Sequence, residues 1–402
     1  MIDINKIRKD FPVYSKQPNI VYLDSAASSL KVRSVIDQLD HYYQDLGANV
    51  HRGAYELAYQ TTMLFEDARQ TVAKFIHADE EEIVFTRGAT SALNMVAHAY
   101  RDILKPGDEI ITSELEHHSS VLPWMIIAKQ TGASLIYIPL TSSGRITVEN
   151  FKSVLSDRTK VVALTHVSNV MGYLTPIAEI TKLAHEKNAV VILDGAQSVP
   201  HMNVDVKLLD IDYLAFSGHK MFGPSGVGVL YGKKHLLNQL EPFEYGGEMA
   251  DIVLKDSVTF KEAPMRLEAG TPVISGAIGL AAAIRYIDSI GLDNIHQHTR
   301  ELQQYTLEKL KQIEGVTIYN ESAENPVITF NIDNVHPHDI ATLLDQKSVR
   351  FFRPSFGVIN PDARSAPDLR RLYFDTAVFY PQSDFFIGFF AVKSFIYFQK
   401  LC

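Results

Sequence analysis

Short apolar runs alternate with helix-patterned segments through the middle of the chain, and this alternation constrains the fold more than any other feature. The runs are rich in Val and Ile without polar alternation, so each is expected to form a strand covered on both faces. They begin near residues 82, 109, 134, 160, 189 and 212. Between them lie segments with helical spacing, such as SALNMVAHAYRDIL and PIAEITKLAHEKN. Repeated strand–helix–strand units predict an α/β protein with a mostly parallel sheet.

The length of the chain predicts more than one domain. It has 402 residues, against roughly 100 to 200 for a typical domain. We expect an N-terminal segment over 1–20 that packs with the small domain, a large α/β ligand-binding domain over 21–275, and a small α+β domain over 276–402. The small domain is predicted from a long helix pattern followed by GVTIYN, PVITFNI and HDIATLLDQ, which indicate strand, strand and helix.

Composition excludes several classes of function. The net charge is −9 and no long block of Lys and Arg occurs, so neither a nucleic-acid surface nor a membrane-binding basic patch is expected. The first residues, MIDINKIRKDFPVY, lack the apolar core of a secretion signal, and no apolar stretch is long enough to span a membrane. The single cysteine, Cys402, excludes an internal disulfide and a cysteine-based metal cage. A cytoplasmic enzyme without a metal is therefore predicted.

Two neighbouring strand ends carry a carboxylate and an amine. AVVILDGAQSVP places Asp194 at the carboxyl end of a buried strand, where open α/β sheets bind ligands, although a carboxylate there could also cap the next helix. DYLAFSGHKMFGPSGVGVLY places Ser217, His219 and Lys220 after the next strand. Burial lowers the pKa of an amine, and such lysines bind carbonyl compounds covalently. A solvated loop lysine is the alternative interpretation.

Two further strand ends carry groups suited to a phosphate and to a flat ring. FTRGATSALN places Gly88, Ala89 and Thr90 at the start of a helix, where backbone amides can hold a phosphate or simply form an ordinary N-cap. EIITSELEHHSSVLPW places His117 and His118 after another strand, where an imidazole can stack on a ring or move a proton. Adjacent histidines point in different directions, so a metal site is the poorer interpretation.

Together these groups specify one ligand. Lys220 can bind an aldehyde, and Asp194 can pair with a protonated ring nitrogen. His117 can stack on the face of a ring, and the helix start at Ala89 can bind a phosphate. Pyridoxal 5′-phosphate (PLP) has all four features, and a lysine with an acidic partner for the ring nitrogen is its signature in proteins. The sequence therefore predicts a PLP site.

The chain resembles the SUF-type cysteine desulfurases and selenocysteine lyases, which belong to the class-V aminotransferase superfamily of fold-type I PLP enzymes. The resemblance covers most of the chain, through NIVYLDSAASSLK, NVHRGAYELA, TRGATSALN, LEHHSSVLPW, THVSNVMG, DGAQSVPH, SGHKMFGPSGVGVLY and RLEAGTP in that order. It implies conversion of L-cysteine to L-alanine, with the sulfur passed as a persulfide to an acceptor protein of the SUF system for iron–sulfur cluster assembly. Selenocysteine is the alternative substrate.

The resemblance also implies how the cofactor is held. Lys220 would bind it covalently and move the α-proton of the substrate, while His117 would stack on its ring. Asp194 would pair with the ring nitrogen and Gln197 would contact the phenolic oxygen. The residues expected at the phosphate are Ala89, Thr90, Ser217, His219 and, reaching into the neighbouring subunit, Thr271. That last contact implies a homodimer.

The substrate side is implied in the same way. The residues expected to line it are His51, Arg52, Asn169 and Arg353. His51 and Arg52 could instead be interface residues, and Asn169 a turn former. Arg350 and Arg371 compete with Arg353 as the group that binds the substrate carboxylate.

The sequence departs from the family in the small domain. Where the family carries a loop cysteine that takes the sulfur, this chain reads SVRFFRPSFGVINPDARSAPDLRRLYFDTAVFYP, and Cys402 lies far beyond that place. We therefore treat 348–402 as atypical, and hypothesise that 348–380 is a frame-shifted piece of a desulfurase. Without the loop cysteine, sulfur transfer is expected to be impaired. The alternatives are another class-V reaction (epimerase, lyase or transaminase) and a non-catalytic PLP-binding partner subunit.

Overall fold

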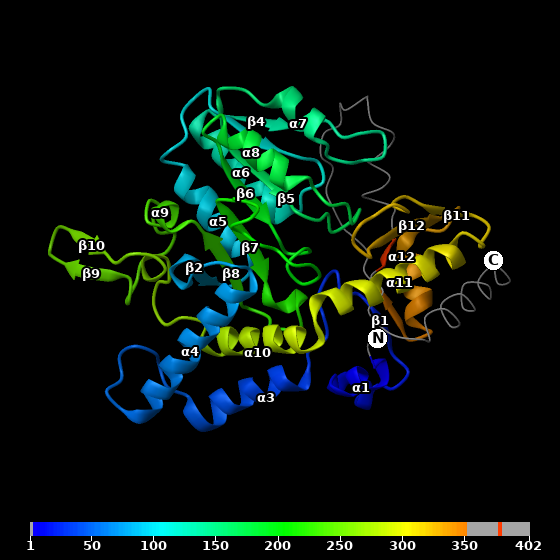
Figure 1. Cartoon of the computed structure of the whole chain (residues 1–402), viewed down its shortest axis with the longest axis horizontal. Coiled ribbons are helices and arrows are strands. Elements are labelled where there is room, and N and C mark those ends of the chain that lie inside the picture. The colour runs from blue at the N-terminus through cyan, green and yellow to red at the C-terminus, as the bar shows by residue number, and fades with distance from the viewer. Residues whose placement is uncertain (1–2, 352–376, 380–402) are drawn as a thin grey trace.

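A seven-stranded sheet forms the centre of the computed structural model, which describes residues 3–351 and 377–379 (Figure 1). Its strand order is β2-β8-β7-β6-β5-β3-β4. The parallel strands are β3 (Glu109–Thr112), β4 (Ser134–Tyr137), β5 (Thr159–Thr165), β6 (Val190–Asp194) and β7 (Tyr213–Ser217). The antiparallel strands β8 (Gly228–Gly232) and β2 (Ile83–Thr86) complete one edge. All six predicted strands are present, so the α/β class is confirmed.

Helices cover both faces of this sheet, which explains why its strands are unalternated apolar runs. Along β6, Ile192 faces a core that includes Trp124, whereas Val191 and Leu193 face a second core that includes Phe65. The first core is covered by α5 (Ala89–Tyr100) and α6 (His118–Thr131). The helices that contribute to the second core are α4 (Glu56–Phe75), α7 (Val148–Val154), α8 (Ile177–His185) and α10 (Ile274–Ile290).

A smaller α+β unit follows α10. It consists of α11 (Leu292–Leu310), α12 (Pro337–Asp345) and a sheet of order β11-β12-β14, with β11 (Val316–Ile318), β12 (Ile328–Ile332) and β14 (Ala377–Phe379). The predicted strand, strand and helix are thus observed at β11, β12 and α12. Strand β13 (Val349–Phe351) pairs in parallel with β1 (Val21–Leu23), which ties this unit to the beginning of the chain. The boundary at residue 275 stays a prediction; α10 packs along α4 and α3 (Arg33–His41).

The N-terminal segment packs through a small apolar cluster that includes Phe11, Ile7 and Val13. Phe11 lies between α1 (Ile4–Lys9) and α2 (Pro12–Lys16), and its ring meets those of Phe222 and Tyr286 edge to face at 5.4 and 6.2 Å. Tyr286 belongs to α10. The remaining short elements are the helical turns η1 (Tyr42–Leu46), η2 (Glu80–Glu82), η3 (Gly218–Lys220), η4 (Met265–Leu267) and α9 (Lys234–Leu237).

An antiparallel hairpin that the sequence analysis did not predict projects from the body of the molecule (Figure 1). It consists of β9 (Ala250–Val253) and β10 (Val258–Phe260), and Ile252, Val253 and Leu254 are exposed on it. Within the described residues, no helix combines the length and the apolar character needed to cross a membrane. Three residues of the sequence analysis, Arg353, Arg371 and Cys402, lie outside the described residues, as does most of the predicted atypical segment.

A buried ion pair joins α4, the edge strand β2 and the segment before α10. The guanidinium of Arg69 in α4 donates to both carboxylate oxygens of Glu268 at 2.8 and 3.0 Å, and also to the carbonyl of Ile83 at 2.7 Å. Glu268 in turn accepts the backbone N–H of Phe85 at 2.7 Å. Because both side chains are almost fully buried, each depends on the other for charge compensation.

Replacement of Arg69 by Met should destabilise the fold strongly. It leaves the Glu268 carboxylate buried without its cation, which costs about 3–5 kcal/mol. The measurement is the urea unfolding midpoint, followed by circular dichroism. Lys187→Met is the matched control, because Lys187 pairs with Asp157 at 2.6 Å on the surface, and its midpoint should stay at the wild-type value. Equal midpoints for the two variants would contradict the prediction.

Candidate active site

Adjacent parallel strands end together at the carboxyl edge of the sheet. Asp194 is the last residue of β6, where it pairs with Thr165 of β5 and Ala215 of β7. Lys220 ends the short turn η3 that directly follows β7. His117 precedes α6, beyond the end of β3. Strand pairing therefore directs three chemically useful side chains from separate stretches of the chain to one edge.

These side chains share one electrostatic environment. Burial lowers the pKa of Lys220 below its usual range, and the nearby Asp194 carboxylate opposes this shift. Burial also lowers the pKa of His117, with Lys220 adding to the shift and Asp194 again opposing it. Both bases are therefore more readily neutral than they would be in water. A neutral amine is the form of lysine that attacks a carbonyl carbon.

The imidazole of His117 is held in one orientation. His117 is the N-cap of α6, and its Nδ1 accepts the backbone N–H of Ser119 at 3.2 Å. The hydroxyl of Ser119 lies 2.7 Å from the same nitrogen. Because Nδ1 acts as an acceptor, the neutral ring carries its proton on Nε2.

The start of α5 forms a cradle with the end of β7. The backbone N–H of Ala89 donates to Ser217 Oγ at 2.8 Å, and Thr90 is exposed beside it. A Cβ atom on Gly228 would lie 2.4 Å from the Cα atom of Gly88, so this close approach of the two backbones requires glycine at position 228. The free N–H groups and the positive end of the α5 dipole make this turn a suitable anion site.

Gln197 and His219 lie in the same region. Gln197 is almost fully buried; its Nε2 donates to the carbonyl of Ala26 at 2.9 Å, while its Oε1 has no hydrogen-bond partner among the described residues. Burial together with Lys220 and Lys31 lowers the pKa of His219 to about 4. A buried amide oxygen without a partner indicates a position that a ligand can satisfy.

The remaining predicted residues lie elsewhere. Thr271 is exposed, and its Oγ1 accepts from Asn49 Nδ2 at 3.4 Å. His51 Nε2 lies 2.8 Å from Glu66, and the exposed Arg52 forms an ion pair with Glu248. Asn169 lies in the hairpin of residues 167–174 that follows β5. Within the described residues, Thr271, His51 and Arg52 thus have partners outside the group around Lys220.

Two buried titratable residues of this edge were missed by the sequence analysis. Glu116 accepts from the hydroxyls of Ser113 and Ser120 at 2.7 and 2.9 Å, and burial raises its pKa to about 8. Burial and the charge of Lys220 lower the pKa of His201 to about 3. Glu116 stands next to His117 in the motif LEHHSSVLPW, and His201 follows Asp194 in the motif DGAQSVPH. Their places in these motifs were the sequence signal that could have identified them.

An open groove of about 520 Å³ leads from this edge to the surface between α5 and α6. Thr90 and His117 line it together with the apolar side chains Leu122, Ile126 and Phe243. The groove therefore lies beside the edge that carries Lys220, and two of the predicted site residues, Thr90 and His117, line it.

Comparisons with known proteins agree with this architecture. The sequence model of the class-V aminotransferase family matches residues 21–351. A probable cysteine desulfurase of Halalkalibacterium halodurans is 49% identical over 353 residues, which cover 87% of each chain. A probable cysteine desulfurase of Staphylococcus aureus strain Mu50 is 45% identical over 354 residues, which cover 86% of each chain.

Solved structures give the same result. The crystal structure of the cysteine desulfurase CsdA (S-sulfonic acid) of Escherichia coli has a TM-score of 0.90 at 34% identity and covers 100% of this chain and 99% of its own. The apo structure of a cysteine desulfurase from Thermococcus onnurineus NA1 has a TM-score of 0.88 at 36% identity, and the match covers 100% of this chain and 97% of that structure's chain. The chain therefore belongs to the class-V aminotransferase family and, within it, to the cysteine desulfurases.

Proposed function

We propose that this protein is a PLP-dependent cysteine desulfurase that converts L-cysteine to L-alanine and passes the sulfur to a thiol acceptor. The observation that carries the proposal is the meeting of Lys220, Asp194 and His117 at one sheet edge, where burial lowers the pKa of both bases and Asp194 supplies the opposing charge. Membership of the cysteine desulfurases supports the choice of substrate.

The residues at this edge fit PLP. Lys220 would hold its aldehyde carbon and Asp194 its ring nitrogen, and the cradle formed by Ala89 and Ser217 would hold its phosphate. Gln197, with a buried oxygen that lacks a partner among the described residues, would contact the ring substituents. When bound, PLP withdraws electrons from the α-carbon of an amino acid, which makes the α-proton acidic.

The chain itself moves the proton and orients the reactants. Burial lowers the pKa of Lys220, which favours the neutral amine that can accept the α-proton and return it. His117, oriented by the Ser119 N–H bond to its Nδ1, would stack its ring on the cofactor. In the reaction, the Cβ–S bond of cysteine breaks, the sulfur bonds to the acceptor thiolate as a persulfide, and the carbon chain gains a proton to become alanine.

The acceptor and the oligomer belong to the same proposal. Cys402 does not occupy the family's loop position, so we propose that the acceptor thiol comes from another molecule, an acceptor protein that serves iron–sulfur cluster assembly. We further propose a homodimer in which Thr271 completes the phosphate site of the partner. Its exposure, and the exposed apolar residues of the β9–β10 hairpin, support a second chain at this surface.

Replacement of Lys220 by Ala should abolish both alanine and sulfide formation. The substitution removes the amine that binds the cofactor and moves the α-proton, so the visible absorbance of the lysine-bound cofactor should also disappear. The measurement is alanine and sulfide release from L-cysteine with dithiothreitol. Lys182→Ala, which changes an exposed lysine of α8, should retain wild-type rates. Alanine formation by Lys220→Ala would contradict the assignment.

Replacement of Asp194 by Asn should lower kcat for alanine formation by roughly 100-fold or more. The variant keeps the shape of the side chain and an acceptor for the Ala196 N–H, which donates to Asp194 Oδ1 at 2.9 Å, but removes the charge. Cofactor content, read from the visible spectrum, should persist because Lys220 and the phosphate cradle are unchanged. A kcat within threefold of wild type would show that Asp194 is a structural cap.

Cys402→Ser should leave alanine formation unchanged when dithiothreitol is present, because an external thiol takes the sulfur. Without dithiothreitol the substrate thiol is the remaining external acceptor, so both proteins should form alanine at the same, lower rate. The measurement is alanine formed per active site in each condition. Loss of turnover in Cys402→Ser with dithiothreitol present would identify Cys402 as the acceptor and overturn this part of the proposal.

A further inference from the structure

The hairpin of residues 167–174 connects the edge that carries Asp194 with the small α+β unit. At its base, the backbone N–H of His166 donates to the carbonyl of Asp194 at 2.9 Å. Thr175 closes the other side, since its Oγ1 donates to the carbonyl of Thr165 at 2.6 Å. The base of the hairpin is therefore hydrogen-bonded to the backbone of Asp194, and Asn169 is part of the hairpin.

The tip of the hairpin is held by buried hydrogen bonds from the segment between β11 and β12. Asn320 Nδ2 donates to the carbonyl of Met171 at 2.9 Å, and the backbone N–H of Asn325 donates to the carbonyl of Gly172 at 3.0 Å. A Cβ atom at Gly172 would lie 2.9 Å from the carbonyl oxygen of Asn325, so only glycine permits this approach. The two backbones are thus in direct contact.

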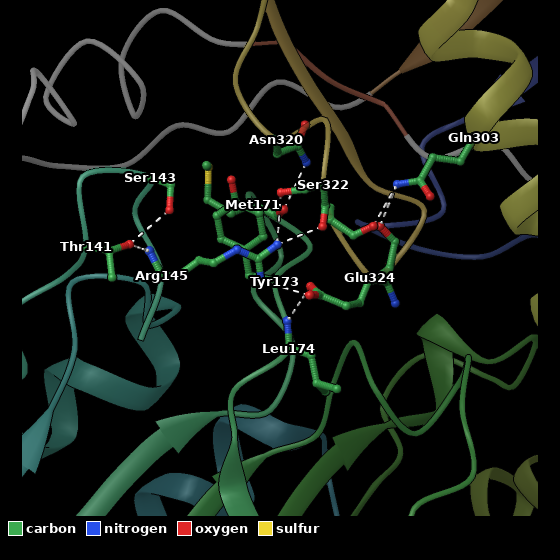
Figure 2. Close-up of polar contacts among 12 residues, drawn as sticks. Thr141, Ser143, Arg145, Met171, Tyr173, Leu174, Gln303, Asn320, Ser322 and Glu324 are labelled. Carbon is green, nitrogen blue, oxygen red and sulfur yellow. Dashed lines mark hydrogen bonds and ion pairs between the residues drawn. The ribbon is translucent and has the colours of Figure 1, made fainter. Parts of the chain in front are cut away.

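A clamp of two charged residues closes over this contact (Figure 2). Arg145, from the loop before α7, lies with its Cζ atom 3.9 Å above the ring of Tyr173 and donates to Glu324 Oε1 at 2.8 Å. It also donates to the carbonyl of Ser322 at 2.7 Å. The second oxygen of Glu324 accepts the backbone N–H of Leu174 at 3.2 Å. One carboxylate therefore bridges the large-domain arginine and the backbone of the hairpin.

Partly exposed ion pairs such as Arg145–Glu324 contribute little to global stability. The donors and acceptors of the clamp instead lie on three separate segments, the Arg145 loop, the hairpin and the loop that carries Glu324. A guanidinium that stacks on a ring and donates through two nitrogens has a fixed position. Such a group sets the orientation of the segments that it joins.

We propose that Arg145 and Glu324 are positioning residues for the substrate side: they hold the 167–174 hairpin against the small unit and so keep Asn169 in position. The inference rests on the proposed function, since it assigns the substrate to this edge. Their loss should weaken substrate binding rather than the chemical step, because in the described part of the chain their hydrogen bonds join the hairpin to the segment between β11 and β12 and do not reach Lys220 or His117.

The test compares Arg145→Met and Glu324→Ala with the matched control Glu321→Ala, all as cofactor-loaded full-length proteins. Glu321 lies in the same loop as Glu324 and forms an ion pair at 2.6 Å with Lys311, at the end of α11. Both partners of this control pair belong to the small unit. The clamp variants should raise hydrogen exchange in the backbone of 166–175 and raise KM for L-cysteine roughly fivefold, the equivalent of one hydrogen bond, with kcat within twofold. Glu321→Ala should match wild type, and Glu324→Gln, which keeps an acceptor for Leu174, should restore part of the loss.

Unchanged exchange in the hairpin, an unchanged KM, or equal effects in Glu321→Ala would each overturn the inference. Failure of the proposed function would appear differently, as absence of alanine formation by the wild-type protein. In that case the apparent Kd for L-alanine, read from the cofactor absorbance, is compared in place of KM. A higher Kd in the clamp variants but not in Glu321→Ala supports the positioning role, and an unchanged Kd overturns it.

Discussion

The backbone pairing of β6 with β5 on one side and β7 on the other determines most of what this protein can do. The register sets Asp194 opposite Thr165 and Ala215, so β5 and β6 end at one level and β7 continues two residues further, to Ser217. Both faces of these strands are buried, and a slip of one residue would exchange their faces and displace Asp194. Since η3 follows β7 without an intervening loop, Lys220 reaches the same edge. The catalytic proposal depends on this pairing.

Burial then gives the edge its chemistry. The same loss of water lowers the pKa of Lys220, His117 and His201 and raises that of Glu116, because each charged form is disfavoured. Asp194 opposes the shifts of Lys220 and His117 and so limits them. The result is a pair of bases, Lys220 and His117, whose neutral forms are favoured, at the same sheet edge as the predicted phosphate cradle at the start of α5. PLP, with its aldehyde, ring nitrogen and phosphate, matches this set of groups.

Two sets of contacts join the described part of the small unit to the rest of the chain. Strand β13 pairs in parallel with β1 in a separate two-stranded sheet, and the segment between β11 and β12 holds the 167–174 hairpin, whose base bonds to the backbone of Asp194. The first set of contacts uses backbone groups, which give a fixed geometry with little dependence on side-chain rotamers. The second combines the backbone N–H of Asn325 with the side chains of Asn320 and Glu324, and so holds the hairpin that carries Asn169. The surface around Thr271 and Arg52, by contrast, is exposed and suits a second chain.

The sequence by itself determined the six strands, the α/β class and the residues proposed to bind PLP, because buried parallel strands have an apolar signature and their ends place Asp194 and Lys220 within short motifs. It did not predict β8, whose glycines resemble a loop, or the β9–β10 hairpin. Only the tertiary structure decided which bases lose water, and which distant residues meet. Arg145 and Glu324 are separated by 179 positions and share no motif. Long-range packing creates such contacts, and it alone sets the burial that shifts each pKa.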